Sequence, residues 1–106
     1  MPDIPELAGF QRKHLREKAH SLRPIVEVGE AGITDSVVGA LAQALRDHEL
    51  VKVRLRQPAD KREAARRLSE AAGATLCGLV GHTVILYRPD PEQPRIAIPT
   101  RETRRP

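Results

Sequence analysis

A chain of 106 residues, 40% of them hydrophobic, is long enough for one small domain with a modest core. Its formal net charge of +4 favours anionic partners, with nucleic acid ahead of an acidic membrane. The single cysteine excludes an internal disulfide framework, and no apolar run approaches the roughly 20 residues of a membrane-spanning helix. With no signal-peptide pattern at the N-terminus, we expect a soluble cytoplasmic protein with no membrane partner.

The first predicted element is a helix over residues 9–22, stopped by Pro24. Apolar residues recur on one stripe at helical spacing: Ala8, Leu15, Ala19 and Leu22. A neighbouring quadrant of the same helix is basic, with Lys13 at its edge, and contains Arg12, Arg16, His20 and Arg23. A solvated amphipathic helix would show this pattern, but it also suits a phosphate-binding face.

Residues 25–28 are predicted to form a short strand that leads into the G-x-x-G tetrapeptide Gly29-Glu30-Ala31-Gly32. Glycine at both ends lets the chain turn tightly and approach a partner closely. The helix expected next would point its free N–H groups and the positive end of its dipole toward the loop, which suits a phosphate. A plain structural turn is the alternative, because strand-to-helix turns often contain glycine.

That second helix is expected to start at Thr34 or Asp35, both good N-caps. Its predicted inward face comprises Val37, Val38, Leu41, Leu45 and His48. Residues 50–55 then alternate between apolar and basic side chains, which predicts a strand with one face toward water. The exposed row of this strand is cationic and consists of Lys52, Arg54 and Arg56.

The third helix has the clearest start signal, since Asp60 and Glu63 have the spacing of a capping box. Gly73 stands where a helix-terminating glycine is expected. The predicted packing side comprises Ala64, Ala65, Leu68, Ala71 and Ala72, and a further cationic row comprises Lys61, Arg62, Arg66 and Arg67. Two strands follow, over residues 74–80 and 83–88, joined at Gly81-His82 as a hairpin.

The order α-β-α-β-α-β-β predicts a single α/β domain. Strands joined through helices imply parallel neighbours, and the closing hairpin adds one antiparallel strand. We therefore expect a four-stranded mixed sheet packed by helices. The domain is expected over residues 1–89, and residues 90–106, rich in proline and arginine, are expected to form a flexible, mildly basic tail.

Signatures of catalysis are missing from the sequence. Its four histidines are scattered, and it contains no G-x-S-x-G, Walker loop or H-E-x-x-H motif. We therefore predict no catalytic residues, no metal, no cofactor and no small-molecule substrate. Phe10 and Tyr87 are the only aromatic residues, so the stacking platforms of many RNA-binding domains cannot be assembled. RNA binding would depend on backbone charge, loop amides and shape.

Three ordered runs within residues 10–89 resemble the CRM domain (chloroplast RNA splicing and ribosome maturation), above all its small bacterial YhbY-like form. They are QRKHLREKAHSLRPIVEVGEAGIT, ALRDHELVKVRL and GLVGHTVILYRP. The resemblance implies the fold of the C-terminal domain of translation initiation factor three, and RNA as the partner. It further implies association with precursors of the large ribosomal subunit and help in their assembly, without catalysis.

By position, the family's G-x-x-G loop corresponds to residues 29–32, and its basic first helix to Arg12, Lys13, Arg16, Lys18 and Arg23. We add His20, Lys52 and Arg54 as candidate RNA contacts. Family members usually have lysine or arginine after the first glycine, where this chain has Glu30, so we expect weaker phosphate binding by the loop. The rival interpretations are a module whose basic face binds an acidic protein and, less favoured, a small DNA-binding protein.

Overall fold

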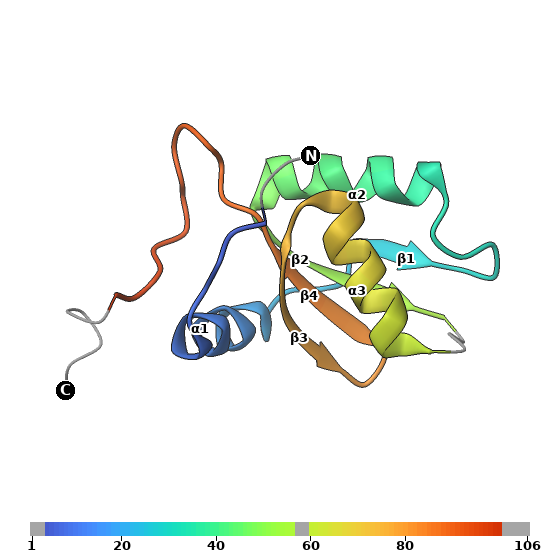
Figure 1. Ribbon diagram of the computed structural model, residues 1–106, viewed down its shortest axis with the longest axis horizontal. Helices are drawn as coiled ribbons and strands as arrows, with labels where there is room; N and C mark the ends of the chain where they lie inside the picture. Colours follow the sequence, from blue (N-terminus) through green and yellow to red (C-terminus); the bar gives the residue numbers. More distant parts are fainter. Residues whose placement is uncertain (1–3, 57–59, 101–106) are drawn as a thin grey trace.

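The computed structural model describes residues 4–56 and 60–100. In this part of the chain, three helices and four strands follow in the predicted order (Figure 1): α1 Gly9–Ala19, β1 Val26–Val28, α2 Asp35–His48, β2 Leu50–Leu55, α3 Lys61–Ala72, β3 Thr75–Val80 and β4 Thr83–Tyr87. None of the helices in these described ranges has the length and apolar character needed to cross a membrane.

Local capping signals set the boundaries of α2 and α3. The Thr34 hydroxyl accepts a hydrogen bond from the Val37 N–H at 3.2 Å, and Asp60 Oδ1 accepts one from the Glu63 N–H at 3.1 Å. At the other end of α3, Gly73 takes the left-handed conformation with φ 61°, which glycine adopts without steric cost. The predicted starts of both helices and the predicted end of α3 are therefore confirmed.

The strands form one mixed sheet in the order β1-β2-β4-β3. β1 and β2 are parallel, whereas β4 is antiparallel to both of its neighbours. The predicted four-stranded mixed sheet is confirmed, but the expectation that every helical connection joins parallel neighbours is wrong for β2 and β3. The β3–β4 hairpin folds back so that β4 lies between β2 and β3, and each of these two strands pairs with β4 instead.

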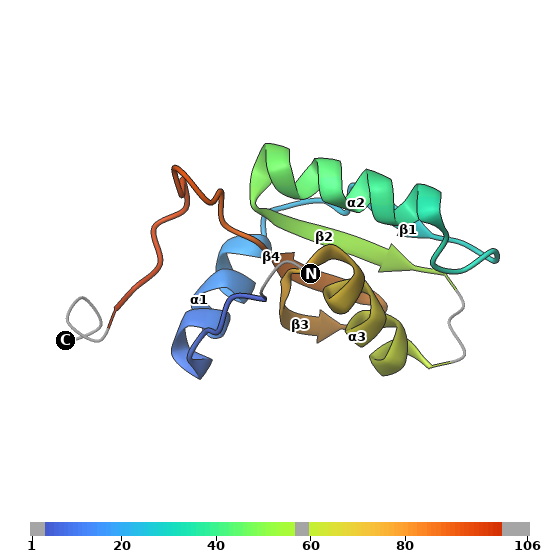
Figure 2. The ribbon, with the colours of Figure 1, turned by 45° about the horizontal axis from the view of Figure 1, so that its top comes forward.

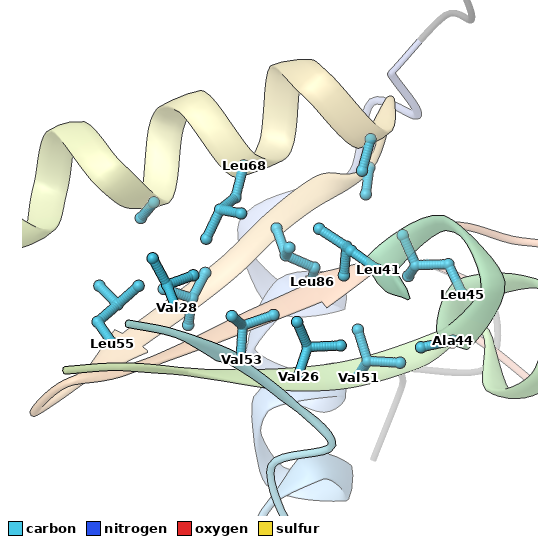
Figure 3. Close-up of a cluster of buried hydrophobic side chains, with 14 residues drawn as sticks. Val26, Val28, Leu41, Ala44, Leu45, Val51, Val53, Leu55, Leu68 and Leu86 are labelled. Carbon is cyan, nitrogen blue, oxygen red and sulfur yellow. The ribbon is translucent and has the colours of Figure 1, made fainter. Parts of the chain in front are cut away.

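The two faces of the sheet are covered by different helices. α2 and α3 pack on one face, where Leu41, Leu45 and Leu68 point toward Val53 and Leu86 of the sheet (Figure 3). α1 lies apart from that pair, at the end of the sheet where β2 begins and β4 ends (Figures 1 and 2). Its contribution to a second cluster is Leu15 and Ala19, which pack with Leu50, Cys77, Ile85 and Tyr87.

Because α1 covers only this end, the prediction that β2 turns one whole face to water needs correction. Leu50 and Val51 face opposite sides of the sheet, and both are buried. Further along β2, Lys52 is half-buried and Arg54 is exposed. The α1-side face of the sheet is thus closed at one end and open at the other.

Three predicted core positions are wrong in the first and second helices. α1 ends at Ala19, three residues before the predicted end, and the chain continues in tight turns, with the Leu22 N–H bonded to the Ala19 carbonyl. Leu22 therefore lies beyond the helix and is 40% exposed, and Ala8, at the opposite end, is the exposed N-cap residue of α1. His48 is also exposed, because α2 ends there and the chain reverses at Glu49, where φ is 64°.

In α3, Ala71 is exposed rather than buried. The packing side of this helix is Ala65, Leu68, Ser69 and Ala72, with Ala64 partly buried beside it. The alanine-rich helix offers little size contrast between its faces, so the sequence pattern does not fix the facing of Ala71.

Candidate nucleic-acid interface

Two of the predicted phosphate contacts on α1 are partly used inside the protein. Arg12 Nη1 donates to the Leu7 carbonyl at 2.5 Å, and Arg16 Nη1 donates to the Cys77 carbonyl at 2.7 Å. The stem of Arg16 passes so close to Gly78 that a Cβ there would lie 2.5 Å from Arg16 Cδ. A guanidinium has five N–H donors, so each arginine keeps donors for a phosphate, but its position is set by the fold.

Basic side chains at the C-terminal end of α1 lie beside the basic row of β2. Arg16 and His20 line a surface hollow together with Lys52, whose Nζ donates to the Leu22 carbonyl at 3.1 Å. An adjoining hollow contains Arg23 and Arg54. Residues about 30 positions apart in the sequence thus share one surface, as the phosphate-binding interpretation requires.

We call this surface the basic face and define it as Arg16, Lys18, His20, Arg23, Lys52 and Arg54. Within the described ranges, the side chains of Lys18, Arg23 and Arg54 take part in no hydrogen bond or ion pair, although the Lys18 carbonyl accepts one from the Ser21 hydroxyl. Of the acids lining its hollows, Glu27 is paired with Arg56 at 3.2 Å, and Glu17 is the other. Lys13, also predicted as a contact, is exposed on α1 but lines none of these hollows.

The G-x-x-G segment forms a closed turn. The Gly32 N–H donates to the Gly29 carbonyl at 3.0 Å, so Glu30 and Ala31 occupy the exposed corners. Gly32 has φ 78°, a conformation that side chains disfavour, and a Cβ at Gly29 would meet no atom within 4 Å. The second glycine is therefore required by the turn, whereas the first leaves open space around the backbone.

The charge around this loop differs from that of the basic face. Its hollow is lined by two arginines, Arg56 and Arg67, and by three acids, Glu30, Asp60 and Glu63. A hydrogen bond from Arg66 lowers the pKa of Glu63, so this carboxylate, ionised at neutral pH in any case, stays ionised to a more acidic pH than a free glutamate. The loop hollow shares no lining residue with the hollows of the basic face. The two predicted contact regions are thus different hollows, linked by the Glu27–Arg56 ion pair, and the loop region is not cationic.

The cations of α3 do not join the basic face either. Arg66 forms ion pairs with Glu63 and Glu70 on the same helix, and these partners raise its pKa. Lys61 and Arg62 line a different hollow with Leu76 and Leu79.

Glu49 is an organising residue that the sequence analysis did not identify. Its carboxylate is fully buried and accepts hydrogen bonds from three backbone N–H groups of the C-terminal segment. The distances are 2.6 Å to Asp90, 2.9 Å to Arg95 and 3.0 Å to Ile96. The Glu49 carbonyl also accepts from the Arg88 N–H at 2.8 Å. A buried carboxylate is stable here because its lone pairs are satisfied.

The chain beyond β4 also has side-chain contacts with the domain. The Arg95 guanidinium donates to the carbonyls of Arg46 and Asp47 at the end of α2. Ile96 and Ile98 pack against the second hydrophobic cluster, to which α1 contributes Leu15 and Ala19. The two isoleucines alternate with other residues in the run RIAIP, which is a signal of packing. The many prolines and arginines around this run led instead to the prediction of a flexible tail. The domain boundary at residue 89 stays a prediction, and residues 101–106 of the expected tail lie outside the described ranges.

The chain is similar to known proteins over most of its length. The model of the CRS1 / YhbY (CRM) domain matches residues 7–88. The probable RNA-binding protein YqeI of Bacillus subtilis is 37% identical over 95 residues, which cover 88% of this chain and 99% of the relative. An RNA-binding protein of Haemophilus influenzae is 35% identical over 97 residues, covering 88% of this chain and 95% of the relative.

A solved structure is similar as well. The solution structure of the hypothetical protein SAV1595 from Staphylococcus aureus superimposes with a TM-score of 0.77 at 33% identity, covering 89% of this chain and all of that one. The family match spans most of the chain, and the two relatives named above align over nearly their whole length. The chain therefore belongs to the CRS1 / YhbY (CRM) domain family, as its motifs predicted.

Proposed function

We propose that this protein is a non-catalytic, cytoplasmic RNA-binding factor that associates with ribosomal RNA of the large-subunit precursor and assists its assembly. The RNA-binding names of its relatives support the general role. The observation that carries the proposal is the basic face, on which cations from α1, the following turn and β2 share adjoining hollows. The ribosomal target follows from the family resemblance.

The proposed mechanism is electrostatic. The side chains of Lys18, Arg23 and Arg54 have no internal partner among the described residues, so they would neutralise phosphates at little cost to the fold. Phosphate contacts position a protein without reading sequence, so the shape of the RNA would supply selectivity. In this scheme the G-x-x-G loop is a secondary contact that sets register through its backbone amides.

Glu30 tests the role of the loop. Because it occupies an exposed corner of the turn, Glu30→Lys replaces a repulsive charge with an attractive one without disturbing a buried contact. We expect RNA affinity to rise by about two- to fivefold at low salt, as one added phosphate contact would give. Glu92→Lys, also at an exposed acid, is the matched control. Equal affinities for both variants would assign the loop a purely structural role.

The assembly role is tested by sedimentation of cell extracts. We expect the protein to sediment with large-subunit precursors and to be released by RNase, and in-cell crosslinking to recover large-subunit ribosomal RNA. Association that survives RNase would favour the rival interpretation, an acidic protein partner. Recovery of scattered messenger RNA would contradict the assembly role while preserving RNA binding.

A further inference from the structure

An apolar hollow adjoins the basic face between the C-terminal ends of α1 and α2. It is lined by Leu50 and Val51 at the start of β2, and by the apolar side chains of Leu22, Ile25 and Ile96. The volume is about 470 Å³, within the range of small-ligand sites. Leu22 is 40% exposed and Ile25 52% exposed, so large apolar side chains remain open to solvent here.

The rim of this hollow is basic. Lys18, Arg23 and His48 line it, and none of its lining residues is acidic. Arg23 also belongs to the next hollow, beside Arg54, so positive charge continues from this rim onto β2. A ligand that matches both properties has an apolar face to bury and carries negative charge on a continuing backbone.

One wall of the hollow depends on the C-terminal segment. Ile96 reaches the site because its own N–H, and that of Arg95, donate to the buried Glu49 carboxylate. Arg95 fixes the same segment through the carbonyls at the end of α2. The wall is therefore set by buried and charge-assisted hydrogen bonds rather than by a loose chain end.

We propose that this hollow, hereafter the nucleotide hollow, accepts an unpaired nucleotide of the bound RNA. The base would lie against Leu22, Ile25 and Ile96, while Lys18 and Arg23 contact the flanking phosphates. Proteins read RNA mainly at unpaired nucleotides, whose bases can be splayed into such sites. The continuation of the basic rim toward Arg54 favours a polyanion over a short acidic peptide. This inference rests on the proposed RNA-binding function. It adds to that function a preference for RNA helices that are interrupted by unpaired nucleotides.

The test compares two fluorescein-labelled RNA hairpins of equal length, one fully paired in its stem and one with a bulge of three nucleotides. Fluorescence anisotropy gives the affinity of each for the full chain. We expect the wild type to bind the bulged hairpin about tenfold more tightly, as burial of one base face would give. The double variant Leu22→Ser, Ile25→Ser should lose this preference but keep its affinity for the paired hairpin.

Ile4→Ser is the matched control, because Ile4 is 41% exposed and lines none of the hollows described above. It should retain the full preference. Ile96→Ala, which shortens one apolar side chain of the hollow, should retain part of the preference for the bulged hairpin. If thermal unfolding shows that the double variant does not fold, a reduced preference in Ile96→Ala supports the proposal and a full preference contradicts it.

Equal binding of both hairpins by the wild type would overturn the nucleotide hollow while leaving RNA binding intact. Failure to bind either hairpin would instead contradict the proposed function. A preference that survives in the variants would place the base elsewhere. In NMR spectra of the labelled protein, shifts of the Leu22 and Ile25 amides on adding a glutamate- and leucine-rich peptide, but not the bulged RNA, would reassign the hollow to a protein partner.

Discussion

Glu49 combines two features that are costly alone: a fully buried carboxylate and a positive φ in a residue other than glycine. Both are offset by its position at the end of α2. There the backbone N–H bonds to Leu45, and the side chain accepts three N–H groups from residues 90–96. One residue thus ends a helix, reverses the chain into β2 and attaches the C-terminal segment.

Glu49→Gln should destabilise the protein by about 2 kcal/mol, because the amide nitrogen replaces an acceptor with a donor that faces a backbone N–H. Chemical unfolding in urea measures this difference. Glu17→Gln, at an exposed site on α1, should change the free energy of unfolding by less than about 0.5 kcal/mol. A loss for Glu49→Gln no larger than this control would show that the C-terminal segment is not fastened there.

Cys77 provides a pH-dependent test of packing under α1. Burial raises the pKa of its thiol from 9.0 to about 11, with Arg16 and Arg12 opposing the shift. The unfolded chain therefore releases this proton at lower pH than the folded protein does. The resulting stability is fully present below pH 9.0 and is lost as the pH rises toward about 11.

Between pH 8 and pH 10 the wild type should lose about 1 kcal/mol more unfolding free energy than Cys77→Ala, which cannot titrate. Urea unfolding of both proteins at the two pH values measures the difference. Tyr87, whose pKa is raised mainly by burial and also by Glu49, is present in both proteins, so its contribution cancels apart from the smaller influence of Cys77 on it. Parallel pH profiles would mean that the thiol is not buried in the folded protein.

At the scale of elements, α1 and β3 contact each other through Gly78. The β3–β4 ladder shifts register between Leu76 and Gly78, which is typical of a β-bulge, and the stem of Arg16 passes over the glycine. The bulge thereby fixes an arginine of the basic face, since Arg16 Nη1 donates to the carbonyl of Cys77, the residue between Leu76 and Gly78.

Gly78→Ala should destabilise the protein by about 1–2 kcal/mol, because the new methyl group would displace the Arg16 stem. Gly39→Ala is the matched control in α2, where a Cβ would meet no atom within 4 Å. It should stabilise the protein by about 0.5–1 kcal/mol, because alanine loses less backbone entropy in a helix. Thermal unfolding checks both signs, and similar effects at the two positions would contradict the Arg16–Gly78 packing.

Local signals predicted most of these elements, whereas features set by distant residues were missed. Asp60, Thr34 and Gly73 act on neighbouring backbone, so sequence spacing was sufficient to place the helix ends. The position of β4 between β2 and β3 depends on pairing across the whole sheet, which no short pattern encodes. Arg16 shows the same limit. Helical spacing placed it on the basic side of α1, but could not reveal the hydrogen bond from its guanidinium to the Cys77 carbonyl.

For the whole molecule, the important property is an uneven distribution of charge rather than the net value of +4. The basic face gathers cations on the α1 side of the sheet, while the G-x-x-G hollow mixes both signs and α3 neutralises Arg66 internally. The charge pattern of the sequence could not predict the burial of Glu49, since a lone acid after a helix is usually solvated. We expect RNA to be bound mainly through the α1 side.

The salt dependence of RNA affinity tests this central claim most directly, with a fragment of large-subunit ribosomal RNA titrated across a series of salt concentrations. The triple variant Lys18→Gln, Arg23→Gln, Arg54→Gln should flatten the slope of log affinity against log salt by about 2–3, or roughly 0.7–0.9 for each lost phosphate contact. The control Arg46→Gln, Lys61→Gln, Arg62→Gln removes the same charge from α2 and α3 and should leave the slope nearly unchanged. Equal slopes for the wild type and the first variant, or equal flattening by both variants, would contradict an RNA-binding surface centred on the basic face.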